Sequence, residues 1–156
     1  MDFQIEPLDA SRFDALLGAS EEALREHQAV RVTAEADHGY PCRVSLADAK
    51  TGETLLLVNY EHMPLESPYR ATHAVYVREH VETSVPAINE VPEMFRSRQI
   101  SVRAFDAEGF LRPAEVVDGK ELEASLERTL STEDVDFVHL HFAAPGCYAA
   151  RAVAVG

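Results

Sequence analysis

The chain has 156 residues, of which 46% are hydrophobic and 26% are charged. This is ordinary usage for a globular protein and excludes an intrinsically disordered one. The 27 acidic residues outnumber the 14 Lys and Arg residues, and the formal charge of −13 repels phosphate backbones and anionic lipid surfaces. We therefore expect one soluble domain over residues 1–156, with no nucleic-acid or membrane partner.

The N-terminus predicts a cytoplasmic protein. Asp2 and Glu6 stand where a signal peptide needs basic residues, and no apolar run follows them. The longest apolar run, TLLLV at 54–58, has the length of a strand rather than of a membrane helix. Two cysteines, Cys42 and Cys147, fit free thiols in a reducing cytosol.

The first third of the chain predicts a short strand followed by two short helices. In SRFDALLG, the apolar residues fall at helical spacing and Gly18 is a natural stop. In SEEALREH, Ser20 is a favourable N-cap, and two glutamates follow in the first turn, where the helix dipole favours negative charge.

From about residue 30 the pattern becomes typical of strands. The expected strands cover residues 30–34, 42–46, 54–60, 73–79, 99–106 and 111–117. Glycines at 52 and 109 mark two of the turns, so several of these strands should pair in antiparallel fashion.

The last third predicts one helix and a final hairpin. Asp118 can cap a helix whose apolar stripe is Leu122, Leu126 and Leu130, and two strands follow it around an APGCY turn. With strands in the majority and about three helices, the sequence predicts an α+β fold built on a mostly antiparallel sheet.

The final hairpin contains VHLHFAAPGCYAAR, residues 138–151. Because side chains alternate along a strand, Val138, Leu140 and Phe142 should face the core while His139 and His141 share the other face. Two imidazoles at this spacing can turn toward one metal ion, although a site needs a third ligand. The alternative is a pair of exposed or hydrogen-bonded histidines.

Three residues elsewhere are candidates for that third ligand: His62, His73 and Cys147. A hairpin with Ala143 opposite Tyr148 would also place small alanines beside the two imidazoles, with Ala150 across from His141 and Ala152 across from His139.

Cys147 follows Pro145 and Gly146, where a sharp turn can present a thiol beside a histidine. It is therefore a candidate nucleophile, with His139 as a candidate catalytic partner. The alternative is a small buried hydrophobic residue without chemistry.

Residues 59–80 form a second dense stretch, which we expect to be a long loop between two strands. It holds Tyr60, His62, Tyr69, Arg70 and further arginine and histidine residues. Arginines and tyrosine hydroxyls can bind a carboxylate or phosphate, but in so acidic a chain they can equally pair with its own carboxylates.

Several segments together resemble one family. They are GYPCRVSLADA (39–49), the GE-LLL-NYEH run (52–62), SPYRA (67–71), VPEMFRSR (91–98), SVRAFDAEG (101–109), EVVDGKELE (115–123) and VHLHFAAPGCYAAR (138–151). They resemble domain-of-unknown-function family 1203, a family of small bacterial proteins that carries no assigned activity, substrate or cofactor.

The resemblance marks the motif residues as candidate site positions: Arg43, Tyr60, His62, Tyr69, Arg70, His139, His141, Cys147 and Arg151. It also implies members with a second cysteine where this chain has Ala150, which weakens any role for a cysteine pair.

The leading hypothesis from the sequence is a pocket for a small anionic molecule where the 59–73 segment meets the 139–151 hairpin. Arg70 and Arg151 would hold the anion, Tyr60 and Tyr69 would donate hydrogen bonds, and the two histidines of the hairpin would form the floor. One alternative is an enzyme that uses a metal on His-x-His or the Cys147 nucleophile. Another is a protein-interaction module.

Overall fold

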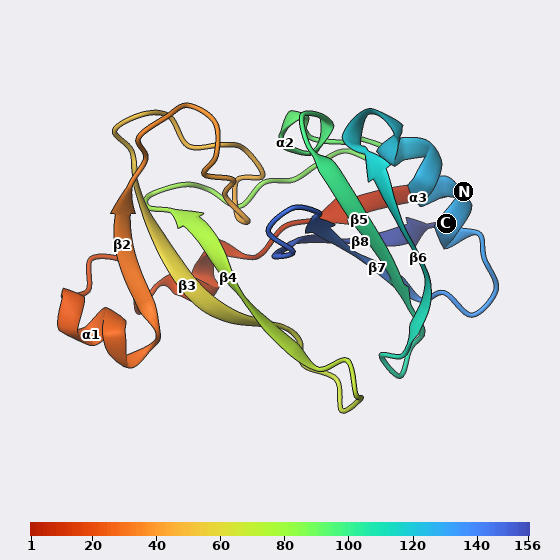
Figure 1. Cartoon of the computed structure of the whole chain (residues 1–156), viewed down its shortest axis with the longest axis horizontal. Helices are drawn as coiled ribbons and strands as arrows, with labels where there is room; N and C mark the ends of the chain where they lie inside the picture. Colours follow the sequence, from red (N-terminus) through yellow and green to blue (C-terminus); the bar gives the residue numbers. More distant parts are fainter.

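The computed structural model describes residues 1–156 and confirms the α+β fold, with the strands divided between two antiparallel sheets (Figure 1). No helix is both long enough and apolar enough to span a membrane. The elements are β1 (Asp2–Glu6), η1 (Ala10–Phe13), α1 (Glu21–Glu26), β2 (Ala29–Thr33), β3 (Thr54–Met63), β4 (Ala71–Arg78), α2 (Glu93–Arg96), β5 (Gln99–Phe105), β6 (Leu111–Asp118), η2 (Gly119–Glu121), α3 (Leu122–Leu130), β7 (Phe137–Phe142) and β8 (Tyr148–Val155).

The larger sheet has five strands in the order β1-β8-β7-β5-β6, every neighbour antiparallel. One of its faces is packed under α3, and the predicted stripe of Leu122, Leu126 and Leu130 is buried there. On β7 this face carries Val138, Leu140 and Phe142, as the alternation predicts.

The smaller sheet has the order β2-β3-β4 and lies beside the larger one (Figure 1). The first helices pack on it: Phe13 of η1 and Leu24 of α1 share a buried cluster with Leu56 and Val75. As predicted, Ser20 caps α1, and its hydroxyl accepts a hydrogen bond from the Ala23 amide.

The prediction of a strand at residues 42–46 is wrong. This segment is a tight turn, closed by a hydrogen bond from the Leu46 amide to the Cys42 carbonyl, with Leu46 at φ 53°. The apolar alternation arises because Cys42 and Val44 pack into the core of the smaller sheet, while Arg43 turns toward β8. The alternation of apolar and polar residues here comes from side-chain packing in a turn, not from pairing with a neighbouring strand.

The expected register of the final hairpin is also wrong. His139 pairs with Arg151, one residue away from the expected Ala152. His141 pairs with Tyr148, because a bulge at Ala149 follows the pairing of Leu140 with Ala150. The alanines therefore lie in the core under α3, and the bulge brings Tyr148 rather than an alanine beside the imidazoles.

Candidate functional site

Four histidines gather where the β3-β4 hairpin meets the outer face of the larger sheet. His62 and His73 come from the hairpin, while His139 and His141 come from β7. Three of them, His62, His139 and His141, are buried and offer ligand atoms that all lie within 4.8 Å of one another.

A β-bulge directs His62 into this cluster. Glu61 pairs with Thr72 and Met63 with Ala71, so His62 is the extra residue of β3. Successive side chains of a regular strand point to opposite faces, but here both His62 and Met63 are buried. The segment predicted as a long loop is therefore mostly strand, with a short turn at residues 64–70.

Aromatic rings pack around the imidazoles. The His62 ring lies 5.6 Å from the His139 ring and 5.2 Å from the His141 ring, centroid to centroid. Tyr148 stacks on His62 at 4.9 Å, and Phe137 contacts His139 at 5.0 Å. These ring contacts restrict how far the imidazoles can turn.

Hydrogen bonds fix some of the ring nitrogens and leave others free. His141 Nδ1 lies 3.0 Å from the Gly146 carbonyl oxygen, to which it donates, so its Nε2 is left with a lone pair. His73 Nδ1 lies 2.7 Å from His62 Nε2. In contrast, His62 Nδ1 and His139 Nδ1 are buried and have no hydrogen-bond partner.

Burial keeps these imidazoles neutral. Loss of hydration, and to a lesser extent the neighbouring histidines and Arg103, lowers the pKa of His62 to about 4, of His139 to about 2 and of His141 to about 3. Burial also lowers the pKa of His73. At neutral pH the cluster therefore offers uncharged nitrogen donors, which is the form that binds a metal.

Arg103 is the charged residue beside the cluster that sequence reasoning missed. It lies on β5 directly opposite His139, and its Nε donates to Ser101 Oγ at 3.0 Å. It makes no ion pair, and burial lowers its pKa. Only the strand pairing could have identified it, because nothing in the local sequence sets it apart.

A pocket of 620 Å³ opens beside the cluster and is lined by His62, His139, Tyr60 and Arg151 among others. The 59–73 segment and the 139–151 hairpin thus meet at one site. Two of the lining groups already have partners within the chain: Arg151 pairs with Glu6 at 3.0 Å, and the Tyr60 hydroxyl accepts a hydrogen bond from Arg12 at 2.9 Å.

Tyr69 and Arg70 do not line this pocket. Arg70 sits at an exposed turn and forms an ion pair with Glu61 at 3.0 Å. The Tyr69 ring packs edge-on against Phe105 and Phe110 and remains 42% exposed.

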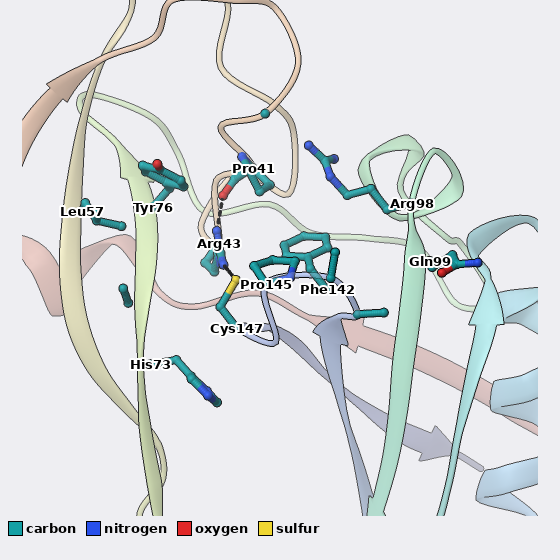
Figure 2. A pocket seen from close by; sticks show the side chains of 14 residues that line it. Pro41, Arg43, Leu57, His73, Tyr76, Arg98, Gln99, Phe142, Pro145 and Cys147 are labelled. Carbon is teal, nitrogen blue, oxygen red and sulfur yellow. Dashed lines mark hydrogen bonds between the residues drawn. The ribbon is translucent and has the colours of Figure 1, made fainter.

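Arg43 and Cys147 lie in a different cavity, which His73 also lines (Figure 2). Both cysteines are free thiols, as predicted. Cys147 Sγ accepts a hydrogen bond from Arg43 at 3.0 Å, and no histidine is bonded to it. Of the three candidate third ligands, the fold therefore brings His62 and His73 to the His-x-His pair and leaves Cys147 aside.

Residues 39–153 match the family described as "Protein of unknown function (DUF1203)". The chain belongs to this family. The DUF1203 match includes the whole histidine cluster, Arg103, Arg43, Cys147 and Tyr148. No curated protein and no solved structure matches the chain. The function must therefore be argued from the site itself.

Proposed function

We propose that this protein binds a divalent transition-metal ion, with zinc the best match, through His62, His139 and His141. The observation that carries the proposal is the pair of buried, unpartnered Nδ1 atoms on His62 and His139 within a group of three converging imidazoles. A buried polar atom without a partner costs about 1–3 kcal/mol, and a bound ion would remove that cost at both atoms.

The donor set supports zinc and its neighbours. Imidazole nitrogen is a common ligand of zinc, copper, iron and nickel, whereas calcium and magnesium prefer oxygen. In a tetrahedral zinc site with bonds of about 2.1 Å the ligand nitrogens lie about 3.4 Å apart. The three ligand atoms lie within 4.8 Å of one another, so small rotations of the side chains would complete the site.

The surroundings of the ligands support the same reading. Metal-binding histidines usually donate their other ring nitrogen to a carbonyl or carboxylate, which fixes the ring. His141 has such a partner in the Gly146 carbonyl, and His62 has His73.

Three protein ligands leave a coordination position for water or substrate, which is the arrangement of catalytic rather than structural zinc sites. His62 and His139 also line the 620 Å³ pocket, so a molecule bound there reaches the ion. Arg103, which has no carboxylate partner, favours an anionic ligand beside the ion. We infer a metal-dependent enzyme that acts on a small molecule with an anionic or carbonyl oxygen.

Cobalt(II) titration of the metal-free protein tests this proposal, because its visible absorption reports ligand type and geometry. We expect one equivalent to bind with a tetrahedral spectrum, and His62→Ala, His139→Ala and His141→Ala each to weaken binding at least tenfold. His27→Ala, which removes an exposed histidine, is the matched control and should bind like the wild type. Three cluster variants that bind cobalt as tightly as the wild type would refute the proposal.

A further inference from the structure

A second cavity, of 760 Å³, lies between β4 and the β7-β8 turn (Figure 2). Half of its 14 lining residues are hydrophobic, and Leu57, Tyr76 and Phe142 provide apolar walls on its two sides. This volume and composition are those of small-molecule sites.

Arg43 forms the polar floor of this cavity, and its charge has no counter-ion. Its side chain is only 1% exposed. It donates to the Tyr148 carbonyl at 2.8 Å, the Pro41 carbonyl at 2.7 Å and Cys147 Sγ at 3.0 Å, and it forms no ion pair with a carboxylate. Buried charges are normally paired, so this guanidinium is an exception that needs a partner.

Arg43 also retains donors for such a partner. A guanidinium has five N–H donors, and the three hydrogen bonds above leave two of them, one on each terminal nitrogen. A carboxylate accepts two parallel hydrogen bonds from a guanidinium, which is its strongest and most specific pairing.

The other arginine of the cavity is already neutralised. Arg98 binds Asp48 through two hydrogen bonds, at 2.6 and 3.0 Å. The ring of Phe142 lies beside both guanidinium groups, 5.1 Å from that of Arg43 and 5.2 Å from that of Arg98. The unbalanced positive charge of the cavity is therefore that of Arg43 alone.

We propose that this cavity binds a small organic monoanion, with its acid group on Arg43 and its apolar body against Tyr76, Leu57 and Phe142. The single unpaired guanidinium fits one negative charge, and the apolar walls fit a hydrocarbon or aromatic body rather than a polar one. The proposal is independent of the metal site, because it rests on none of the three proposed ligands.

Cys147 gives a direct readout of occupancy. It is partly exposed and lines the cavity, whereas Cys42 is 0% exposed, so an alkylating reagent reports on Cys147. We would measure the rate at which N-ethylmaleimide modifies Cys147 in the metal-free protein by mass spectrometry. The probes are benzoate, phenylacetate, 4-phenylbutanoate and 1-naphthoate, each beside its neutral amide.

We expect at least one carboxylate to slow alkylation tenfold or more at saturation, and its amide to slow it less than twofold. Arg43→Met should abolish the protection while circular dichroism shows the fold retained. Should that variant fail to fold, Ala74→Phe fills the cavity from β4 while Arg43 itself is kept, and it should abolish the protection, whereas Thr72→Phe on the same strand should not.

Equal protection by an acid and its amide would show that the charge is not recognised and would overturn the proposal. Protection by none of the four acids, or protection that persists in Arg43→Met or Ala74→Phe, would also overturn it. Because metal-free protein is used throughout, none of these outcomes depends on whether the histidines bind an ion.

Discussion

The ring of His62 lies flat on the ring of Tyr148, with centroids 4.9 Å apart and planes 9° apart. His62 is the extra residue of a bulge in β3. A second bulge, in the pairing of β7 with β8, places Tyr148 opposite His141. Each sheet thus supplies one ring to the stack, which joins the two sheets beside the histidine cluster.

This stack predicts that the ring of Tyr148, not its hydroxyl, supports the metal site. Tyr148→Phe keeps the stack and should leave the zinc dissociation constant within about threefold of the wild type. Tyr148→Ala leaves a cavity beside His62, and we expect weaker zinc binding by at least tenfold and a loss of about 3–5 kcal/mol in unfolding free energy. Zinc binding that is lost equally in both variants would show that the hydroxyl itself takes part.

His73 should act on the ion through His62. Its Nδ1 lies 2.7 Å from His62 Nε2, and partners of metal ligands typically change affinity by about 10–100-fold when they are removed. We expect that loss for His73→Ala in a zinc competition assay. His73→Asn retains a hydrogen-bonding side chain and should recover part of the affinity. A His73→Ala affinity equal to that of the wild type would mean that His62 is held by its packing alone.

The stability of the metal-free protein should fall as the pH drops from about 6.5 to 5. Burial lowers the pKa of His62, His139 and His141 in the folded state, while in the unfolded chain they titrate near 6.5. In this window the unfolded state binds more protons, so the unfolding free energy rises with pH and is lost as the pH falls.

Each of these groups contributes up to about 1.4 kcal/mol per pH unit. In urea denaturation, His139→Leu should therefore reduce the slope of the unfolding free energy against pH by about that amount. An unfolding free energy that does not change between pH 6.5 and 5 in the wild type would show that the histidines are not buried in neutral form.

The contact between α2 and η2 leaves no room for a side chain at Gly119. A Cβ atom there would lie 1.7 Å from the Phe95 carbonyl oxygen, and the Gly119 amide donates to the Arg98 carbonyl at 2.8 Å. We expect Gly119→Ala to lower the unfolding free energy, measured by urea denaturation, by more than about 3 kcal/mol. Gly52→Ala is the control. It adds the same methyl group where φ is 90° but the space is open, and it should cost only about 1–2 kcal/mol, the penalty of an L-residue in a left-handed conformation. Equal losses would mean that the backbone at Gly119 moves away.

Local patterns in the sequence predicted the elements that depend on local chemistry. The structure confirms three of them: the Ser20 cap, the apolar stripe of α3, and the placement of Val138 and His139 on opposite faces of β7. Each follows from capping preferences or from the spacing of apolar residues. The helix α2 was missed because its four residues are too few to show a period.

The composition of the histidine cluster depends on bulges and on pairing between distant strands. The sequence identified His139 and His141 as a pair and His62 as one of three candidate partners. The bulge at His62 interrupts the alternation that sequence reasoning uses. The bulge at Ala149 shifts the pairing by one residue, so that Tyr148 rather than Ala149 lies opposite His141. Arg103 enters the site only through its pairing opposite His139.

The metal site is tested by the elemental metal content of the protein purified without a histidine tag, measured beside the double variant His139→Ala/His141→Ala. We predict close to one equivalent of zinc or another first-row transition metal in the wild type, after reconstitution if needed, and none in the double variant. A wild-type protein that holds no metal even after reconstitution, or a double variant that holds as much as the wild type, would show that these histidines are not metal ligands.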